Sequence, residues 1–286
     1  MESVSRLGVV GGGLMGSGIA EVAALRGIEV LVAEAAPEAA DTGRERVGAS
    51  LDRAVARGKI TEEERDAARS RLRFTHDLGD MADRQFVIEA VAENPGIKTD
   101  VIRTLDKVVE DQDAILATNT SSIPIVDLAV ATHRPDRVIG MHFFNPVPVQ
   151  RLVELIPALT TSRDTQERTR RLAVEQLGKE AIQAADQSGF VVNALLIPYL
   201  LSAVRMLESG VARAEDIDRG MELGCAHPMG PLRLLDLIGL DTAQAVAESM
   251  YEEFKEPLYA APALLRRMVA AGRLGRKTGR GFYSYA

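Results

Sequence analysis

The sequence predicts an α/β protein in which a mostly parallel β-sheet, covered by helices, is followed by an all-helical C-terminal domain. Two observations predict this fold class. Between residue 7 and about residue 185, short β-rich runs alternate with amphipathic helical segments, an alternation typical of parallel sheets. After Ser188 the strand signals stop and only helical patterns remain. We therefore expect a sheet domain at residues 1–187 and a helical domain at residues 188–286.

The predicted strands are short apolar runs, which in chain order are LGVV, IEVLVA, FVIEAV, AILATN, RVIGMHF and RLVELI. A long charged segment, roughly Ala39 to Arg73, follows the second run and is dense in Arg and Glu. Its pattern predicts a helical arm that projects from the sheet domain. The helices expected after Ser188 are Phe190 to Ser209, Ala214 to Leu223, a stretch after Pro231, Thr242 to Phe254, and Ala263 to Ala271.

The composition excludes several classes of protein. With 46% hydrophobic residues in 286, the chain can bury a sizeable core. Its 34 Lys and Arg residues are outnumbered by 41 Asp and Glu residues. The resulting net charge of −7 gives no global attraction to nucleic acid or to an anionic membrane surface. The most apolar stretch, Gly189 to Val204, contains Asn193 and Pro198 and is shorter than the roughly 20 residues of a membrane span. We interpret it as a buried helix.

The cysteine content and the N-terminus point to the cell interior. A single cysteine, Cys225, argues against a disulfide framework and against a four-cysteine zinc site, and we expect no metal. The first residues lack the succession of basic, apolar and small residues that marks a secretory signal. These features predict a cytoplasmic protein.

A glycine-rich turn follows the first predicted strand and leads into a helical pattern. Its residues GGGLMG match G-x-G-x-x-G: Gly11 permits the tight turn, Gly13 lets backbone N–H groups approach a pyrophosphate, and Gly16 allows close packing on the strand. Leu14 and Met15 open the helix, whose N-terminus attracts the anion. The alternative is a generic glycine turn. The strand–turn–helix context favours a Rossmann-type dinucleotide site.

Glu34, at the end of the second predicted strand, supports this site. A carboxylate there can accept hydrogen bonds from a ribose diol, and it would repel the 2′-phosphate of NADP. No Arg follows within AEAAPEAA, so NAD is favoured as the cofactor. The loop after FVIEAV carries Glu93 and Lys98 at the edge where parallel sheets bind ligands. The alternative for these two residues is a solvated loop and a charge at a helix start.

Polar side chains also follow the next two predicted strands. Asn119, Ser121 and Ser122 form a turn after AILA, and RVIGMHFFNPVP delivers His142 and Asn145. The unperturbed pKa of histidine lies near neutrality, so His142 can take a proton from a hydroxyl while hydride leaves the same carbon. The remaining histidines lie in segments typical of structural or solvated side chains: His76, His133 and His227.

Glu154 is a lone acid in the apolar strand RLVELI. A carboxylate beside His142 would fix the imidazole tautomer and offset the charge of the imidazolium. The alternative is a solvent-facing side chain on an edge strand, and the pattern alone does not decide between the two.

The motifs, taken together, resemble those of the 3-hydroxyacyl-CoA dehydrogenases, and more closely those of the short bacterial 3-hydroxybutyryl-CoA dehydrogenases. The likeness covers nearly the whole chain. It consists of motifs in a fixed order: GGGLMGSGIAE, VIEAVAEN, TNTSSIPI, GMHFFNPVPV followed by LVEL, SGFVVNALLIPYL, HPMGPLRLLDLIGLD and GRKTGRGFY.

The resemblance implies a role for each matching residue. His142 matches the family's acid/base histidine and Glu154 its carboxylate partner, which favours the functional interpretation of Glu154. Ser121 and Asn193 match side chains that hydrogen-bond the reacting oxygen and the acyl group. Positions around the nicotinamide half of NAD, its ribose or its phosphates are matched by Glu93, Lys98, Asn145 and Lys277. Ser50 and Arg57, in the arm, match positions that hold CoA.

The implied reaction is oxidation of a 3-hydroxyacyl-CoA at C3 by NAD, and the reverse reduction of acetoacetyl-CoA. The family also implies a homodimer through the helical domain. This chain departs from the common pattern in several places: Glu34 replaces Asp, Arg57 replaces Lys, Ala194 stands where Arg is frequent, and the usual proline before Gly189 is missing. Two rival functions are a related two-domain dehydrogenase of a free hydroxy acid or sugar acid, and a non-catalytic NAD-binding protein.

Overall fold

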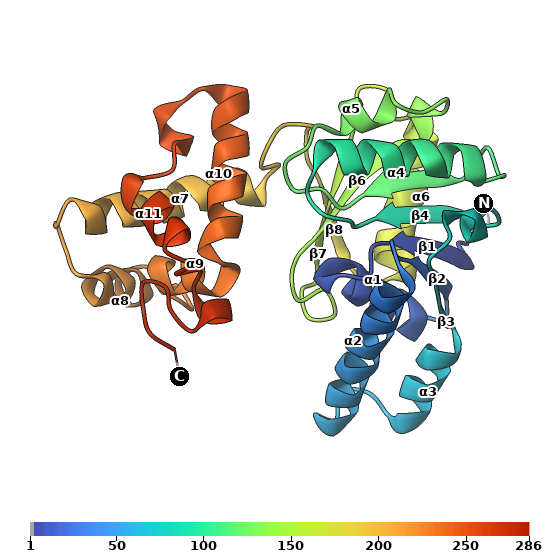
Figure 1. Cartoon of the computed structure of the whole chain (residues 1–286), viewed down its shortest axis with the longest axis horizontal. Coiled ribbons are helices and arrows are strands. Elements are labelled where there is room, and N and C mark those ends of the chain that lie inside the picture. The colour runs from blue at the N-terminus through green and yellow to red at the C-terminus, as the bar shows by residue number, and fades with distance from the viewer. Residues whose placement is uncertain (1–2, 286) are drawn as a thin grey trace. The chain divides into compact units, whose positions relative to one another are not determined.

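The computed structural model describes residues 3–285 and divides after Asp186 into two compact units. The first unit contains every β-strand of the sheet, and the second is built from helices (Figure 1). Among the described residues, no helix combines the length and the apolar character that crossing a membrane would require. The expected fold class, a Rossmann-type α/β domain followed by an all-helical domain, is confirmed.

One eight-stranded sheet, in the order β3-β2-β1-β4-β5-β6-β7-β8, organises the first unit. All neighbouring strands are parallel except β6 and β7, which are antiparallel. The strands are β1 (Arg6–Val10), β2 (Glu29–Ala33), β3 (Leu72–Thr75), β4 (Phe86–Glu89), β5 (Ile115–Thr118), β6 (Val138–Phe143), β7 (Leu152–Pro157) and β8 (Glu180–Gln183).

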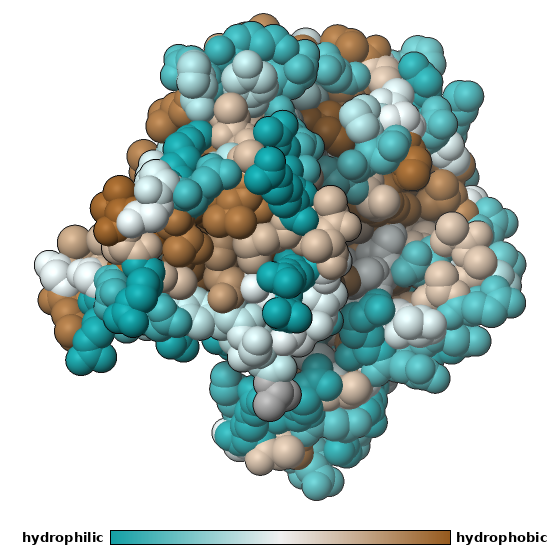
Figure 2. Space-filling model, turned by 60° about the vertical axis from the view of Figure 1, so that its left-hand side comes forward, coloured by the Kyte–Doolittle hydropathy of each residue, from teal (hydrophilic) through white to brown (hydrophobic). Residues whose placement is uncertain are grey.

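The predicted helical arm consists of α2 (Pro37–Ala56) and α3 (Glu62–Ser70), which extend away from the sheet (Figure 1). Thr61 starts α3 with a capping box, because its side chain accepts a hydrogen bond from the backbone of Glu64 and the Glu64 side chain accepts one in return. The exposed surface of the arm is largely hydrophilic (Figure 2). Val47 and Leu51 of α2 are nevertheless buried, and they join the core beneath the arm.

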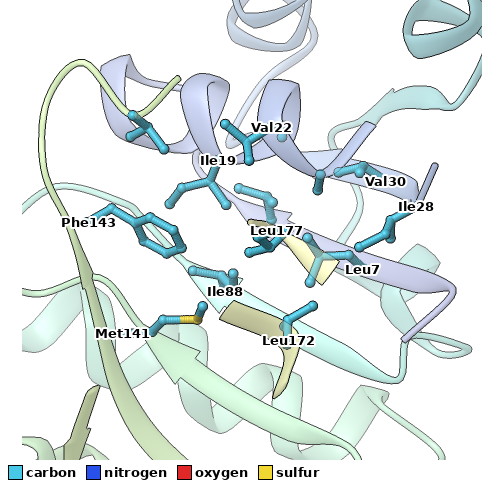
Figure 3. Packing of buried hydrophobic residues seen from close by; sticks show 14 of the residues in the cluster. Leu7, Ile19, Val22, Ile28, Val30, Ile88, Met141, Phe143, Leu172 and Leu177 are labelled. Carbon is cyan, nitrogen blue, oxygen red and sulfur yellow. The ribbon is translucent and has the colours of Figure 1, made fainter. Parts of the chain in front are cut away.

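A hydrophobic core of the first unit lies between one face of the sheet and α1 (Leu14–Leu25). Figure 3 shows Leu7 and Ile88 from neighbouring strands facing Ile19 and Val22 of this helix. Central strands are buried on both faces, so their sequences are continuous apolar runs. The other helices of this unit are α4 (Pro95–Val108), α5 (Ile125–Ala129) and α6 (Arg163–Arg171), with short turns η1 (Leu78–Met81), η2 (Pro135–Arg137) and η3 (Leu172–Gln176).

Two strands of the sheet, β3 and β8, were not predicted, and both lie at its edges. The residues of β3 and β8 are only partly buried or exposed, so the apolar signal of a buried strand is missing. Because β3 begins at Leu72, the predicted extent of the arm to Arg73 was wrong: Arg73 is a strand residue.

The second unit contains α7 (Val192–Glu208), α8 (Ala214–Gly224), α9 (Pro231–Ile238), α10 (Leu240–Phe254) and α11 (Ala263–Ala270), with turns η4 (Pro257–Tyr259) and η5 (Arg276–Thr278). Its own core includes Leu200, Leu235 and Met250. The predicted start of the first of these helices at Phe190 was wrong. Phe190 has a φ of 47°, a left-handed conformation that a right-handed helix cannot contain, so α7 begins at Val192.

The C-terminal motif GRGFY is fixed by a buried carboxylate of α9. Asp236 accepts hydrogen bonds from the backbone N–H groups of Phe282 and Tyr283, both at 2.9 Å, and from the hydroxyl of Tyr285, also at 2.9 Å. Its side chain approaches the chain closely at Gly281, where a Cβ would lie 1.9 Å from Asp236 Oδ1. The glycine of this motif therefore serves the packing of the helical unit.

Candidate active site

The carboxyl ends of four parallel strands place most of the predicted site residues on one edge of the sheet. Strands β1, β4, β5 and β6 are consecutive in the sheet and parallel, so the chain leaves all of them on the same side. Asn119, just after β5, accepts a hydrogen bond from the backbone N–H of Phe143 at 2.9 Å and so joins two of these ends. Ligands of open α/β sheets bind at this edge.

The glycine-rich turn between β1 and α1 has the geometry that a pyrophosphate requires. Gly11 has a φ of 94°, and a Cβ there would lie 2.7 Å from the carbonyl oxygen of Ala90. A Cβ on Gly16 would lie 1.8 Å from the carbonyl oxygen of Gly11, so both positions need glycine. A Cβ on Gly13 would meet open space, which leaves room for a ligand.

The start of α1 is also suited to a dinucleotide. Among residues 3–285, no side chain caps its N-terminus, so its first N–H groups are available to an anion. Leu14, at the first position of this helix, is 63% exposed, and Met15 is half-buried. The turn and the helix start therefore fit the pyrophosphate of NAD.

Glu34 lies just after β2, where the ribose-binding carboxylate was expected. Its Oε1 accepts a hydrogen bond from the N–H of Gly12 at 2.6 Å, which fixes the carboxylate beside the glycine turn. A second charged side chain reaches the same glycine, since Arg46 of α2 donates from Nη1 to the Gly12 carbonyl at 2.5 Å. Arg46 was not predicted, because it lies outside the segment that follows Glu34 and only the fold of the arm brings it to this point.

Glu93 contacts both Lys98 and the turn that carries Ser121. Lys98 Nζ lies 3.3 Å from Glu93 Oε2. Glu93 Oε1 accepts hydrogen bonds from the hydroxyl of Thr120 at 2.5 Å and from the N–H of Ser121 at 2.9 Å. Burial alone would raise the pKa of Glu93, but the Lys98 ammonium and the hydrogen bonds from Thr120 and Ser121 outweigh it and lower this pKa overall.

A further buried carboxylate, Glu89, belongs to this cluster and was not predicted. It is the last residue of β4 and is fully buried. Lys98 Nζ donates to its two oxygens at 2.7 and 3.0 Å, and Lys98 is itself only 1% exposed. The signal was present in the sequence, because Glu89 is an acid inside the apolar run FVIEAV.

His142 and Glu154 form a buried hydrogen-bonded pair. The antiparallel register of β6 and β7 places them directly opposite each other. Nδ1 of His142 lies 2.7 Å from Oε2 of Glu154. The His142 side chain is 8% exposed and that of Glu154 is fully buried. Because Glu154 engages Nδ1, any proton exchange between this ring and a substrate would take place at Nε2.

The aromatic ring of Phe144 packs beside His142, and the centroids of the two rings lie 4.7 Å apart. Asn145, which follows, is exposed at the same end of β6. A buried imidazole that is held by a carboxylate can act as a general base towards a hydroxyl. The arrangement thus supports proton transfer coupled to chemistry at a hydroxyl-bearing carbon.

The remaining predicted residues lie in the arm and in the second unit. Ser50 faces α1 and donates a hydrogen bond to Glu21; burial raises the pKa of that carboxylate, and the hydrogen bond opposes the rise. Arg57 is exposed at the end of α2. In the second unit, Asn193 is half-buried in the first turn of α7, and Lys277 pairs with Asp241 at 2.6 Å. Their expected contacts with CoA, substrate or cofactor stay predictions.

Comparison with known protein families gives two matches that together span almost the whole chain. Residues 6–187 match the model of the 3-hydroxyacyl-CoA dehydrogenase NAD-binding domain. Residues 189–285 match the model of the 3-hydroxyacyl-CoA dehydrogenase C-terminal domain. The residues of the glycine turn, the Glu93–Lys98 cluster and the His142–Glu154 pair all lie within the first match.

Individual relatives are similar over their full length. A 3-hydroxybutyryl-CoA dehydrogenase of Mycobacterium tuberculosis is 57% identical over 284 residues, which cover 99% of both chains. The crystal structure of FadB2 from M. tuberculosis matches with a TM-score of 0.99 at 57% identity and covers all of both chains. The structure of the (S)-3-hydroxybutyryl-CoA dehydrogenase PaaH1 from Ralstonia eutropha matches with a TM-score of 0.94 at 46% identity, covering 99% of this chain and 100% of that one.

Proposed function

Because the chain belongs to the 3-hydroxyacyl-CoA dehydrogenase family, we propose that it oxidises (S)-3-hydroxybutyryl-CoA to acetoacetyl-CoA with NAD and catalyses the reverse reduction. The observation that carries this proposal is the buried hydrogen bond of 2.7 Å between His142 and Glu154 at the ligand-binding edge of the sheet. The four-carbon acyl group is supported by relatives of 45% to 57% identity that are named as 3-hydroxybutyryl-CoA dehydrogenases.

The residues of this chain supply the proton chemistry. Nε2 of His142 takes the proton of the 3-hydroxyl group during oxidation and returns it during reduction. Glu154 holds the imidazole in the required tautomer and offsets the positive charge that develops on it. Ser121 and Asn193 are proposed to hydrogen-bond the reacting oxygen and the acyl group. When bound, NAD supplies the hydride acceptor.

The cofactor is proposed to lie along the strand ends. The turn of Gly11, Gly13 and Gly16 would hold the pyrophosphate, and Glu34 would accept hydrogen bonds from the adenosine ribose. Glu93 and Lys98 would face the nicotinamide half. Remote binding energy from CoA, for which Ser50 and Arg57 are proposed, would help to position C3 of the substrate.

A spectrophotometric assay of NADH oxidation tests the function. We expect acetoacetyl-CoA to be reduced with a kcat/KM at least about 100-fold above that for free acetoacetate, because only the thioester carries the CoA moiety. We also expect NADPH to be at least about tenfold less efficient than NADH, because Glu34 would repel its 2′-phosphate. Equal efficiency with free acetoacetate would contradict the assignment of a CoA substrate, and a preference for NADPH would show that Arg46 outweighs Glu34.

We also propose that the protein is a homodimer that associates through its helical unit and works in the cytoplasm. Apolar side chains gather on the surface of this unit (Figure 2). The exposed apolar side chains of this unit include Leu195, Met206, Val211 and Leu223, of which Leu195 is 74% exposed. Exposed apolar side chains of this size favour protein association when they gather on one surface. Light scattering is expected to give a molar mass near twice the chain mass of 30.9 kDa.

A further inference from the structure

Glu89 is a buried carboxylate that no proposed step of the reaction uses. It contacts Lys98, one of the residues proposed to face the nicotinamide half of the cofactor. Glu89 accepts hydrogen bonds from Lys98 Nζ at 2.7 and 3.0 Å, from the N–H of Val91 at 2.7 Å and from the hydroxyl of Thr118 at 2.6 Å. These donors come from α4, from the loop after β4 and from β5. Glu89 therefore ties together the two strand ends that carry the cofactor-binding loop and the Ser121 turn.

Charge explains why a carboxylate is needed at this point. An ammonium group that is removed from water requires a compensating negative charge close by. The second carboxylate near Lys98, that of Glu93, is farther away at 3.3 Å and its side chain is 37% exposed. Glu89 is thus the main fixed counter-charge that keeps the Lys98 ammonium at the end of β4.

The same ammonium orients the Ser121 turn through Glu93. One oxygen of Glu93 faces Lys98, while the other accepts hydrogen bonds from the Ser121 N–H at 2.9 Å and the Ser122 N–H at 3.2 Å. The order of contacts is therefore Glu89, Lys98, Glu93 and the turn. A change at Glu89 would propagate along this order without any direct contact with a ligand.

We propose that Glu89 is a positioning residue for the cofactor: it fixes the Lys98 ammonium, and through Lys98 and Glu93 it sets the geometry of the nicotinamide-binding edge. This inference rests on the proposed NAD-dependent function. It differs from a purely structural role because it requires Glu89 to act on cofactor affinity through Lys98.

The test is the nearly isosteric variant Glu89→Gln, with NADH binding measured by fluorescence titration and stability by thermal unfolding. We expect the dissociation constant of NADH to rise about tenfold, because the charge-assisted hydrogen bonds to Lys98 are weakened. In a Lys98→Met background, the additional substitution Glu89→Gln is expected to change this constant less than about twofold, because the two residues act as one unit.

Asp106→Asn is the matched control. Asp106, also on α4, is a buried carboxylate that pairs with Arg134 at 2.9 Å and with His133 at 2.8 Å. Its substitution is expected to lower the melting temperature without changing NADH affinity. Should Glu89→Gln fail to fold, Thr118→Val, which removes one hydrogen bond to Glu89, is expected to raise the NADH dissociation constant about threefold.

Two results would overturn the proposal. One is a Glu89→Gln variant, or its substitute Thr118→Val, that loses thermal stability while its NADH affinity stays at the wild-type value. The other is a tenfold loss of affinity on Glu89→Gln that persists in the Lys98→Met background. Failure of the proposed function would look different, because the wild type would then bind NADH without oxidising it in the presence of acetoacetyl-CoA.

Discussion

Replacing His142 with alanine is expected to lower kcat for acetoacetyl-CoA reduction by about 1,000-fold, within the range known for loss of a general acid/base. The imidazole is the group proposed to exchange a proton with the reacting oxygen, and water would not replace it efficiently in a site where the His142 side chain is only 8% exposed. Steady-state kinetics with saturating NADH and acetoacetyl-CoA measures the effect. Affinity for NADH, from fluorescence titration, is expected to stay within about twofold, because His142 is not assigned to the cofactor.

His133→Ala serves as the control histidine. Its side chain is 91% exposed and lies against Asp106, which is not a site residue. We expect this variant to retain the kcat of the wild type. Wild-type turnover in the His142→Ala variant would refute the assignment of His142 as the acid/base, independently of the kcat of the His133→Ala variant.

The sequence predicted the central part of the fold well because its central strands are buried on both faces. Their apolar runs are visible without any knowledge of the tertiary structure, as in the strand β4 with its four fully buried residues. The edge strands β3 and β8 were missed for the opposite reason. Their side chains are partly exposed, so Arg73 and Glu180 interrupt the apolar pattern.

Residues of the candidate site were predictable where local context was sufficient. The turn that requires Gly11 and Gly16 was predictable because it depends on the strand and the helix that directly flank it. Whether Glu154 faces solvent or pairs with His142 could not be predicted from local context. Its partnership with His142 depends on the antiparallel register of β6 and β7, which juxtaposes residues from two strands and is not encoded in the spacing of either one.

Two residues were missed for different physical reasons. Arg46 reaches the Gly12 carbonyl from the arm, a contact between elements that are distant in the sequence, so only the fold could reveal it. Glu89 was within reach of sequence reasoning. A lone acid in an apolar strand needs a partner, which holds for Glu89 as it does for Glu154. The partner of Glu89 is Lys98, which follows on the next helix.

The second large effect is expected for Glu154→Gln, which should lower kcat by about 1,000-fold while the melting temperature changes little. Glutamine keeps the size of the side chain and can still hydrogen-bond Nδ1 of His142, but it no longer carries a charge. The imidazolium that forms during catalysis would then lack its counter-charge, and the amide can also favour the wrong imidazole tautomer, which in other histidine–carboxylate pairs costs up to about 10⁴-fold. Steady-state kinetics and thermal unfolding measure the two properties.

If Glu154 acts only through His142, as proposed, the double variant His142→Ala/Glu154→Gln should be no slower than His142→Ala alone, as is expected for residues that work as a unit. Glu180→Gln is the matched control: it removes a carboxylate from the neighbouring strand β8, where Glu180 pairs with Arg151 at the surface, and it should leave kcat unchanged. Multiplicative losses in the double variant would mean that Glu154 contributes independently of the histidine. The hydrogen bond of 2.7 Å would then be a feature of the folded sheet and not the basis of the chemistry.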